Sequence, residues 1–203
     1  DTLCPRDQPE GLPALAVDEP TISMTFQVNK SPFAGKEGKY LTSRQIRERL
    51  ETELKHNVAL RVEPREDPDK FRVSGRGELH LSVLIENMRR EGFELAVSRP
   101  EVILHEENDV LTEPWEQLTV DFEEAYQGAV MTRLADRKGE VQAIIPDGKG
   151  RVRIDYRIPT RGLIGFRTEY LTATSGTGLM YHVFEKYDRY IPEDLGQRNN
   201  GVL

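Results

Sequence analysis

The pattern of strands and helices that occurs twice along the chain constrains the fold most. From Thr21 to Val97, stretches in which every second residue is apolar alternate with stretches of period three to four, and a second such series runs from Leu118 to Val183. Period two is typical of a half-buried strand, and the longer period of an amphipathic helix. Each series gives the order strand, helix, strand, strand, helix, strand. We therefore predict an α+β fold with two tandem ferredoxin-like βαββαβ sandwiches, each containing an antiparallel four-stranded sheet.

The first unit carries clear helix boundaries. Thr42 and Gln45 form a capping box, so a helix is expected to begin there and to end near Asn57. A second helix is expected from about Gly77 to Glu91, with Gly92 as its C-terminal stop. The expected strands have the apolar faces Ile22, Met24, Phe26 and Val28; Leu60 and Val62; Phe71 and Val73; and Phe93, Leu95 and Val97.

The second unit repeats this order. Its first helix has the stripe Tyr126, Val130 and Leu134, and a helix is expected in 161–174 despite Gly162 and Gly165. Its strands have the apolar faces Leu118, Val120 and Phe122; Val141, Ala143 and Ile145; Val152, Ile154, Tyr156 and Ile158; and Leu179, Tyr181 and Val183.

These patterns divide the chain into five parts. Prolines spaced through residues 1–20 predict an extended linker, since proline is excluded from helix interiors and central strands. The two ferredoxin-like domains are expected at 21–99 and 115–190. Residues 100–114 are expected to be a connector, about which the domains fold semi-independently, and 191–203 form a terminal segment.

Composition indicates a soluble globular protein, with 37% hydrophobic and 31% charged residues. No apolar run approaches the roughly 20 residues that span a bilayer, so no membrane association is expected. The single cysteine, Cys4, cannot form an intrachain disulfide, which fits the cytoplasm. A net charge of −7 argues against indiscriminate nucleic-acid binding, so RNA contacts are expected only at local basic patches.

No catalytic residue, metal site or cofactor is predicted. The four histidines are scattered without metal-ligand spacing. The glycine turn at 74–78 lacks the Gly-Lys-Ser/Thr end of a phosphate loop, and the stretch from Asn29 has Pro32 where a guanine-reading motif requires Asp.

Two groups of basic residues are candidate RNA contacts. Arg151, Arg153 and Arg157 share the polar face of one strand, followed by Arg161 and Arg167. This stripe suits phosphate contacts, or alternatively forms salt bridges to neighbours such as Asp155. The second group lies in the loop 30–40, which contains Lys30, Lys36 and Lys39.

Three stretches resemble the BipA (TypA) family of translational GTPases. They are Ser31–Gly35 followed by Thr42–Leu50, the turn Gly75–Leu81, which is also similar to elongation factor G and its relatives, and Pro159–Arg167. The resemblance covers essentially the whole chain. It implies a fragment with the ferredoxin-like domains that correspond to domains III and V of elongation factor G. The segment before residue 21 then resembles the exit of a β-barrel domain, and 191–203 the entry to a C-terminal domain.

The resemblance implies the ribosome-binding portion of such a GTPase, with roles in ribosome assembly and stress-responsive translation. GTP hydrolysis, with GTP and Mg, is then expected in the missing N-terminal domain of the parent protein, and no enzymatic activity in this fragment. The expected partners are ribosomal RNA, ribosomal proteins and the parent's own GTPase and C-terminal domains.

Two other classes of function stay open from the residues. Tandem ferredoxin-like domains also build small-molecule sensors of the ACT type, which would bind an amino acid between domains. An acylphosphatase-type enzyme would need an arginine in the first strand-to-helix loop, where this chain has lysines instead. An RNA-recognition motif is disfavoured because the predicted open sheet face lacks stacking aromatic residues.

Overall fold

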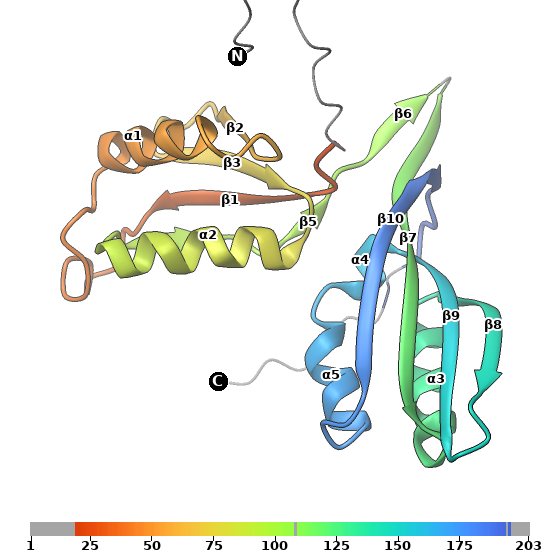
Figure 1. The fold of residues 1–203 in the computed structure, drawn as a ribbon. Coiled ribbons are helices and arrows are strands. Elements are labelled where there is room, and N and C mark those ends of the chain that lie inside the picture. Colours follow the sequence, from red (N-terminus) through yellow and green to blue (C-terminus); the bar gives the residue numbers. More distant parts are fainter. Residues whose placement is uncertain (1–18, 108, 194, 196–203) are drawn as a thin grey trace, which may run out of the picture.

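The computed structural model describes residues 19–107, 109–193 and 195. The predicted linker 1–20 and terminal segment 191–203 lie largely outside these residues. The described chain forms two sheets, each with its own helices and its own apolar core (Figure 1).

The first unit is an antiparallel sheet of order β2-β3-β1-β4. Its strands are β1 (Ile22–Val28), β2 (Arg61–Pro64), β3 (Lys70–Gly75) and β4 (Leu95–Val97), with the short β5 (Glu101–Val102) also paired to β1. Every second side chain of β1 and β3 points into the core, and on the opposite face Ser23 and Ser74 are buried as well. Helices α1 (Ser43–Leu54) and α2 (Glu78–Glu91) supply the rest of the core, whose members include Phe26, Phe71, Leu50 and Leu84.

The helix boundaries of the first unit are as the sequence predicts. Thr42 accepts a hydrogen bond from the Gln45 backbone and the Gln45 side chain accepts one from the Thr42 backbone, so the capping box is present. Helix α2 ends at Gly92, whose φ of 95° places it in the left-handed region where glycine is favoured.

The second unit has the same topology, with sheet order β10-β7-β9-β8. Its elements are β6 (His105–Glu107), β7 (Val110–Glu123), the 3-10 turn η1 (Glu124–Tyr126), α3 (Gln127–Asp136), β8 (Glu140–Pro146), β9 (Arg151–Pro159), α4 (Thr160–Leu163), α5 (Phe166–Ala173) and β10 (Leu179–Arg189). Both sheets follow the ferredoxin-like order that the sequence predicts. Each gains a fifth short strand, β5 or β6, that was not expected.

The segment 100–114, expected to be a connector, contains regular structure. It holds β5, β6 and the first residues of β7, and β6 pairs with β7 from His105↔Thr112 to Glu107↔Val110. The charged residues there gave no periodic apolar pattern, because this short hairpin is held by backbone pairing rather than by a buried face.

Strand β8 differs from its predicted face. A bulge between Val141 and Ala143 shifts the register, so that Val141 lies opposite Tyr156 whereas Ala143 lies opposite Asp155. Val141 and Ala143 therefore point to opposite faces, and the expectation of one shared apolar face is wrong. Because β8 is an edge strand, Val141, Ile144 and Ile145 keep 44–50% of their surface exposed.

The predicted helix in 161–174 is divided into α4 and α5. Gly165 has a φ of 70°, in the left-handed region, which ends α4 and lets α5 begin in a new direction. The carbonyl groups of Gly162 and Ile164 accept hydrogen bonds from the Arg137 guanidinium at 2.7 and 3.2 Å. The buried Arg137 thus satisfies backbone groups that a continuous helix would have paired.

Candidate functional site

The lysine loop of the first unit, residues 30–40, is organised around the Glu94 carboxylate. Its oxygens accept hydrogen bonds from the backbone N–H groups of Gly35 at 3.0 Å and Gly38 at 3.1 Å, and from the Asn29 side chain at 2.7 Å. Burial raises the pKa of Glu94, but these hydrogen bonds and one from Glu37 outweigh it, so the pKa lies below its usual value. The ionised carboxylate thereby fixes the shape of the loop.

This loop presents an aromatic ring and cations to solvent. Phe33 is 66% exposed, and the Lys36 ammonium lies 4.6 Å from its ring centroid. Lys36 and Lys39 are exposed and form no ion pair within the described ranges, whereas Lys30 pairs with Asp69 at 3.0 Å. Of the three predicted lysines, two are therefore available to a partner.

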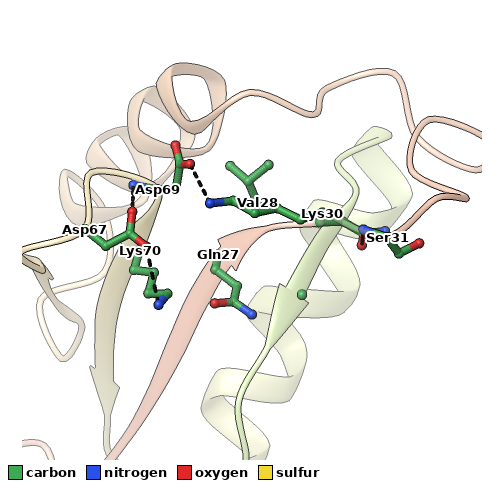
Figure 2. A pocket seen from close by; sticks show the side chains of 9 residues that line it. Gln27, Val28, Lys30, Ser31, Asp67, Asp69 and Lys70 are labelled. Atoms are coloured by element: carbon green, nitrogen blue, oxygen red, sulfur yellow. Dashed lines mark hydrogen bonds and ion pairs between the residues drawn. The ribbon is translucent and has the colours of Figure 1, made fainter.

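A shallow pocket of about 370 Å³ lies at the base of this loop. Figure 2 shows Asp67, Asp69 and Lys70 facing the end of β1 at Gln27 and the start of the loop at Lys30. Lys70 pairs with Asp67 at 3.3 Å, and Lys30 with Asp69. Because these charges neutralise one another, the pocket offers no unpaired charge to a charged ligand.

The arginines of β9 point to the open side of the second sheet, as predicted, because Val152, Ile154, Tyr156 and Ile158 fill the core. Each has an acidic neighbour. Arg151 donates to Asp121 at 2.5 Å, and Arg153 to Asp155 at 3.1 Å. Of the two interpretations of this stripe, the salt-bridged one describes the structure.

Arg157 belongs to a larger cluster on the same face. It donates to Glu185 at 2.7 Å and to Asp188 at 2.5 Å, and its guanidinium lies 4.4 Å from the Trp115 ring centroid. Trp115 itself is 4% exposed. Arg157 thus covers the only tryptophan of the chain and pairs with carboxylates, which leaves little of its charge for an external phosphate.

Arg161 is an internal structural residue. Its side chain is 16% exposed, and it pairs with Glu113, whose side chain is 0% exposed, at 2.5 Å. It also donates to the carbonyl groups of Ile191 and Glu193. Arg161 was a candidate RNA contact in the sequence, where no local pattern shows the buried Glu113, 48 residues away along the chain.

Arg167 is the predicted arginine that remains available. It is exposed on α5 and forms no ion pair in the described part of the chain. It lines a groove of about 330 Å³ between α5 and β10 together with Leu171, Leu179 and Tyr181. Leu179 and Tyr181 are 65% and 55% exposed, so a cation and two apolar side chains adjoin one another here. The expectation that Leu179, Tyr181 and Val183 form the core-facing side of the last strand is wrong, because Met180 packs against the core instead.

A histidine–carboxylate pair lies near this groove. His182 on β10 pairs with the nearly buried Glu116 on β7. The hydrogen bond to Glu116 raises the pKa of His182, although burial and the nearby Arg167 oppose it. No local pattern in the sequence indicates this pair, because Glu116 and His182 lie 66 residues apart along the chain.

The second unit matches a protein-family model, and the whole chain matches named relatives. Residues 110–198 match the family model described as "Elongation factor G C-terminus". Over all 203 residues, the chain is 66% identical to "Large ribosomal subunit assembly factor BipA" of Salmonella typhimurium, and 64% and 59% identical to proteins of the same name from Haemophilus influenzae and Buchnera aphidicola. The chain belongs to the BipA family. It spans 33% of the length of these relatives.

A solved structure shares the fold of this BipA-family chain. A crystal structure of a protein from Thermus thermophilus aligns with a TM-score of 0.53 over 91% of this chain and 44% of the other, at 14% sequence identity. At that identity the likeness concerns the fold alone, and it is consistent with the tandem ferredoxin-like units.

The described residues show neither a metal-binding cluster nor a membrane-spanning helix. In the ranges 19–107 and 109–193, no group of three or more His, Cys, Asp or Glu side chains is arranged to hold a metal ion. No helix of the described chain is both long and apolar enough to cross a membrane. Among the basic residues singled out from the sequence, those without an acidic partner in the described chain lie in the loop 30–40 and beside the groove at Arg167.

Proposed function

We propose that this chain is the ribosome-binding portion of a translational GTPase that acts in large-subunit assembly and in stress-responsive translation. The observation that carries the proposal is identity of 66% over the whole chain to a protein named as a large ribosomal subunit assembly factor. In this proposal GTP and Mg bind to another domain of the parent protein, which works in the cytoplasm. The chain's own role is to bind the ribosome and to contact the parent's GTPase and C-terminal domains.

In this proposal each of two domains, at 21–99 and 115–190, contributes its own contact surface, and the geometry supports this. The first presents Lys36 and Lys39 on a loop of fixed shape, and the second presents Arg167 beside an apolar groove. Unpaired cations on a chain of net charge −7 suit local contacts with RNA phosphates, because each contact releases counterions. Arg151, Arg153, Arg157 and Arg161 contribute to the fold in this proposal, and Lys30 stabilises the base of its loop.

A binding experiment with purified ribosomal subunits tests this function. The 203-residue chain and the full-length protein are sedimented with large subunits and, separately, with small subunits. We expect the chain to co-sediment with large subunits without added GTP, and the full-length protein to bind more tightly because it makes further contacts. If the full-length protein binds and the chain does not bind at any salt concentration, the ribosome-binding role belongs to other domains.

A further inference from the structure

The loop 30–40 presents a large aromatic ring in a fixed position. Phe33 is 66% exposed, and the Lys36 ammonium lies 4.6 Å from its ring centroid. A scattered exposed apolar side chain is ordinary on a protein surface. Phe33 differs because the backbone beneath it is held in place and because Lys36, the cation beside its ring, has no acidic partner within the described residues.

Glu94 holds that backbone. Both carboxylate oxygens accept hydrogen bonds from Gly35, and one of them also accepts from Gly38. A Cβ atom added at Gly38 would lie 2.6 Å from the Glu94 Cβ, so only glycine fits there. These hydrogen bonds order the loop, which has no hydrophobic core of its own. Its conformational entropy is therefore already lost in the free protein, so that a partner can bind without the further cost of ordering the loop.

The chemistry of the loop tip selects a particular class of ligand. A flat apolar ring stacks on a flat π-surface, and adjacent lysines attract negative charge. An unstacked nucleotide offers both, since it has a base with two π-faces and phosphates on either side. An apolar protein pocket fits less well, because it would have to bury the Lys36 ammonium together with the ring.

We propose that Phe33 is a stacking platform for an unpaired base of RNA, with Lys36 and Lys39 at the adjoining phosphates. Glu94 acts as a positioning residue that fixes the loop. The inference rests on the proposed ribosome-binding function and adds to it the kind of RNA element, a single-stranded loop or bulge, that this surface recognises.

The affinity of Phe33 variants for large ribosomal subunits should show whether Phe33 stacks on an RNA base or inserts into an apolar protein pocket. Phe33→Trp retains an aromatic plane, whereas Phe33→Leu retains an apolar side chain without a π-face. We expect the Trp variant to bind as tightly as wild type or more tightly, and the Leu and Ala variants to bind about tenfold more weakly, the loss typical of one stacked base. If Leu retains affinity and Trp loses it, Phe33 inserts into a protein pocket and the proposal fails.

Photo-crosslinking identifies the partner directly. A benzoylphenylalanine at position 33 of the full-length protein, irradiated on the ribosome, should crosslink to an rRNA nucleotide that is unpaired in the free subunit. Crosslinks only to ribosomal protein, or none when the protein is bound, contradict the stacking proposal. If wild-type chain and full-length protein fail to bind ribosomes at all, the proposed function itself fails, which is a separate result.

The role of Glu94 is tested by combining its substitution with a substitution of Phe33. Glu94→Gln keeps the size of the side chain but removes the charge that the loop amides surround. We expect it to weaken ribosome binding in wild type and to have much less effect in a Phe33→Ala background, because it acts through the position of Phe33. Lys36→Ala should instead reduce the salt dependence of binding, because it removes a cation from a phosphate. Equal effects of Glu94→Gln in both backgrounds would show a general structural role and overturn the positioning role.

Discussion

The Glu78 carboxylate at the start of α2 accepts a hydrogen bond from the backbone N–H of Gly165, 3.2 Å away, at the start of α5. The two residues belong to different units. The donor is a backbone group left without an intrahelical partner at a helix N-terminus, where negative charge is favourable. Beside it, Ile164 packs against the core of the first unit. This small contact links the two units.

Glu78→Ala should loosen the link between the units while leaving each unit folded. An exposed carboxylate at a helix N-terminus contributes about 0.3–1 kcal/mol, so stability should change little. We expect a broader distribution of distances between spin labels placed in the turns 65–69 and 147–150, measured by electron paramagnetic resonance. Glu51→Ala, at an exposed carboxylate of α1, serves as the control and should not change the distribution. An unchanged distribution in Glu78→Ala would show that other contacts fix the orientation.

Arg161→Ala should strongly destabilise the second unit. It leaves the fully buried Glu113 carboxylate without its cation, a change that costs about 3–5 kcal/mol in comparable pairs. The matched control, Arg167→Ala, removes an exposed arginine without an ion pair in the described chain and should stay within about 0.5 kcal/mol of wild type. Trp115 fluorescence during urea unfolding reports the second unit selectively, because it is the only tryptophan. Similar losses in both variants would contradict the internal role of Arg161.

The His182–Glu116 pair should make the second unit pH-dependent. Because Glu116 raises the pKa of folded His182, the pair stabilises the fold fully below the unfolded pKa of about 6.5. This contribution is lost as pH rises through the folded pKa. We expect the His182 ring to titrate above about 6.5 by NMR in wild type, and at a lower pH in Glu116→Gln. A wild-type ring that titrates below the Glu116→Gln ring would reverse the sign and contradict the pairing.

The isolated chain should neither bind nor hydrolyse GTP. No Gly-Lys-Ser/Thr sequence is present, and Pro32 stands where a guanine-reading motif needs Asp. The measurement is the fluorescence anisotropy of a labelled GTP titrated with the chain. Micromolar binding would show a nucleotide site that these motifs do not describe.

The helices of the first unit could be predicted from local patterns in the sequence. The capping box at Thr42 and the Gly92 stop depend on neighbouring residues, so the ends of α1 and α2 could be predicted. The β8 bulge could not, because Val141, Ala143 and Ile145 are spaced two residues apart like one strand face, and only the pairing with β9 shows the inserted residue.

The candidate site was only partly predictable. Lys36, Lys39 and Arg167 were identified by charge alone, and they are the candidates that the structure leaves without acidic partners in the described chain. The neutralisation of Arg161 by Glu113 joins positions far apart in sequence, and so does the placement of Glu94 under the loop 30–40. No periodic pattern encodes such contacts.

The salt dependence of binding to large ribosomal subunits tests most directly whether unpaired cations of this chain bind ribosomal RNA. For each cation–phosphate interaction that a substitution removes, the slope of log affinity against log salt concentration falls by about 0.7–0.9. We expect a smaller slope for Lys36→Ala, Lys39→Ala and Arg167→Ala, and the wild-type slope for Arg153→Ala, whose guanidinium already pairs with Asp155. A reduced slope for Arg153→Ala, with wild-type slopes for the other three, would contradict the assignment.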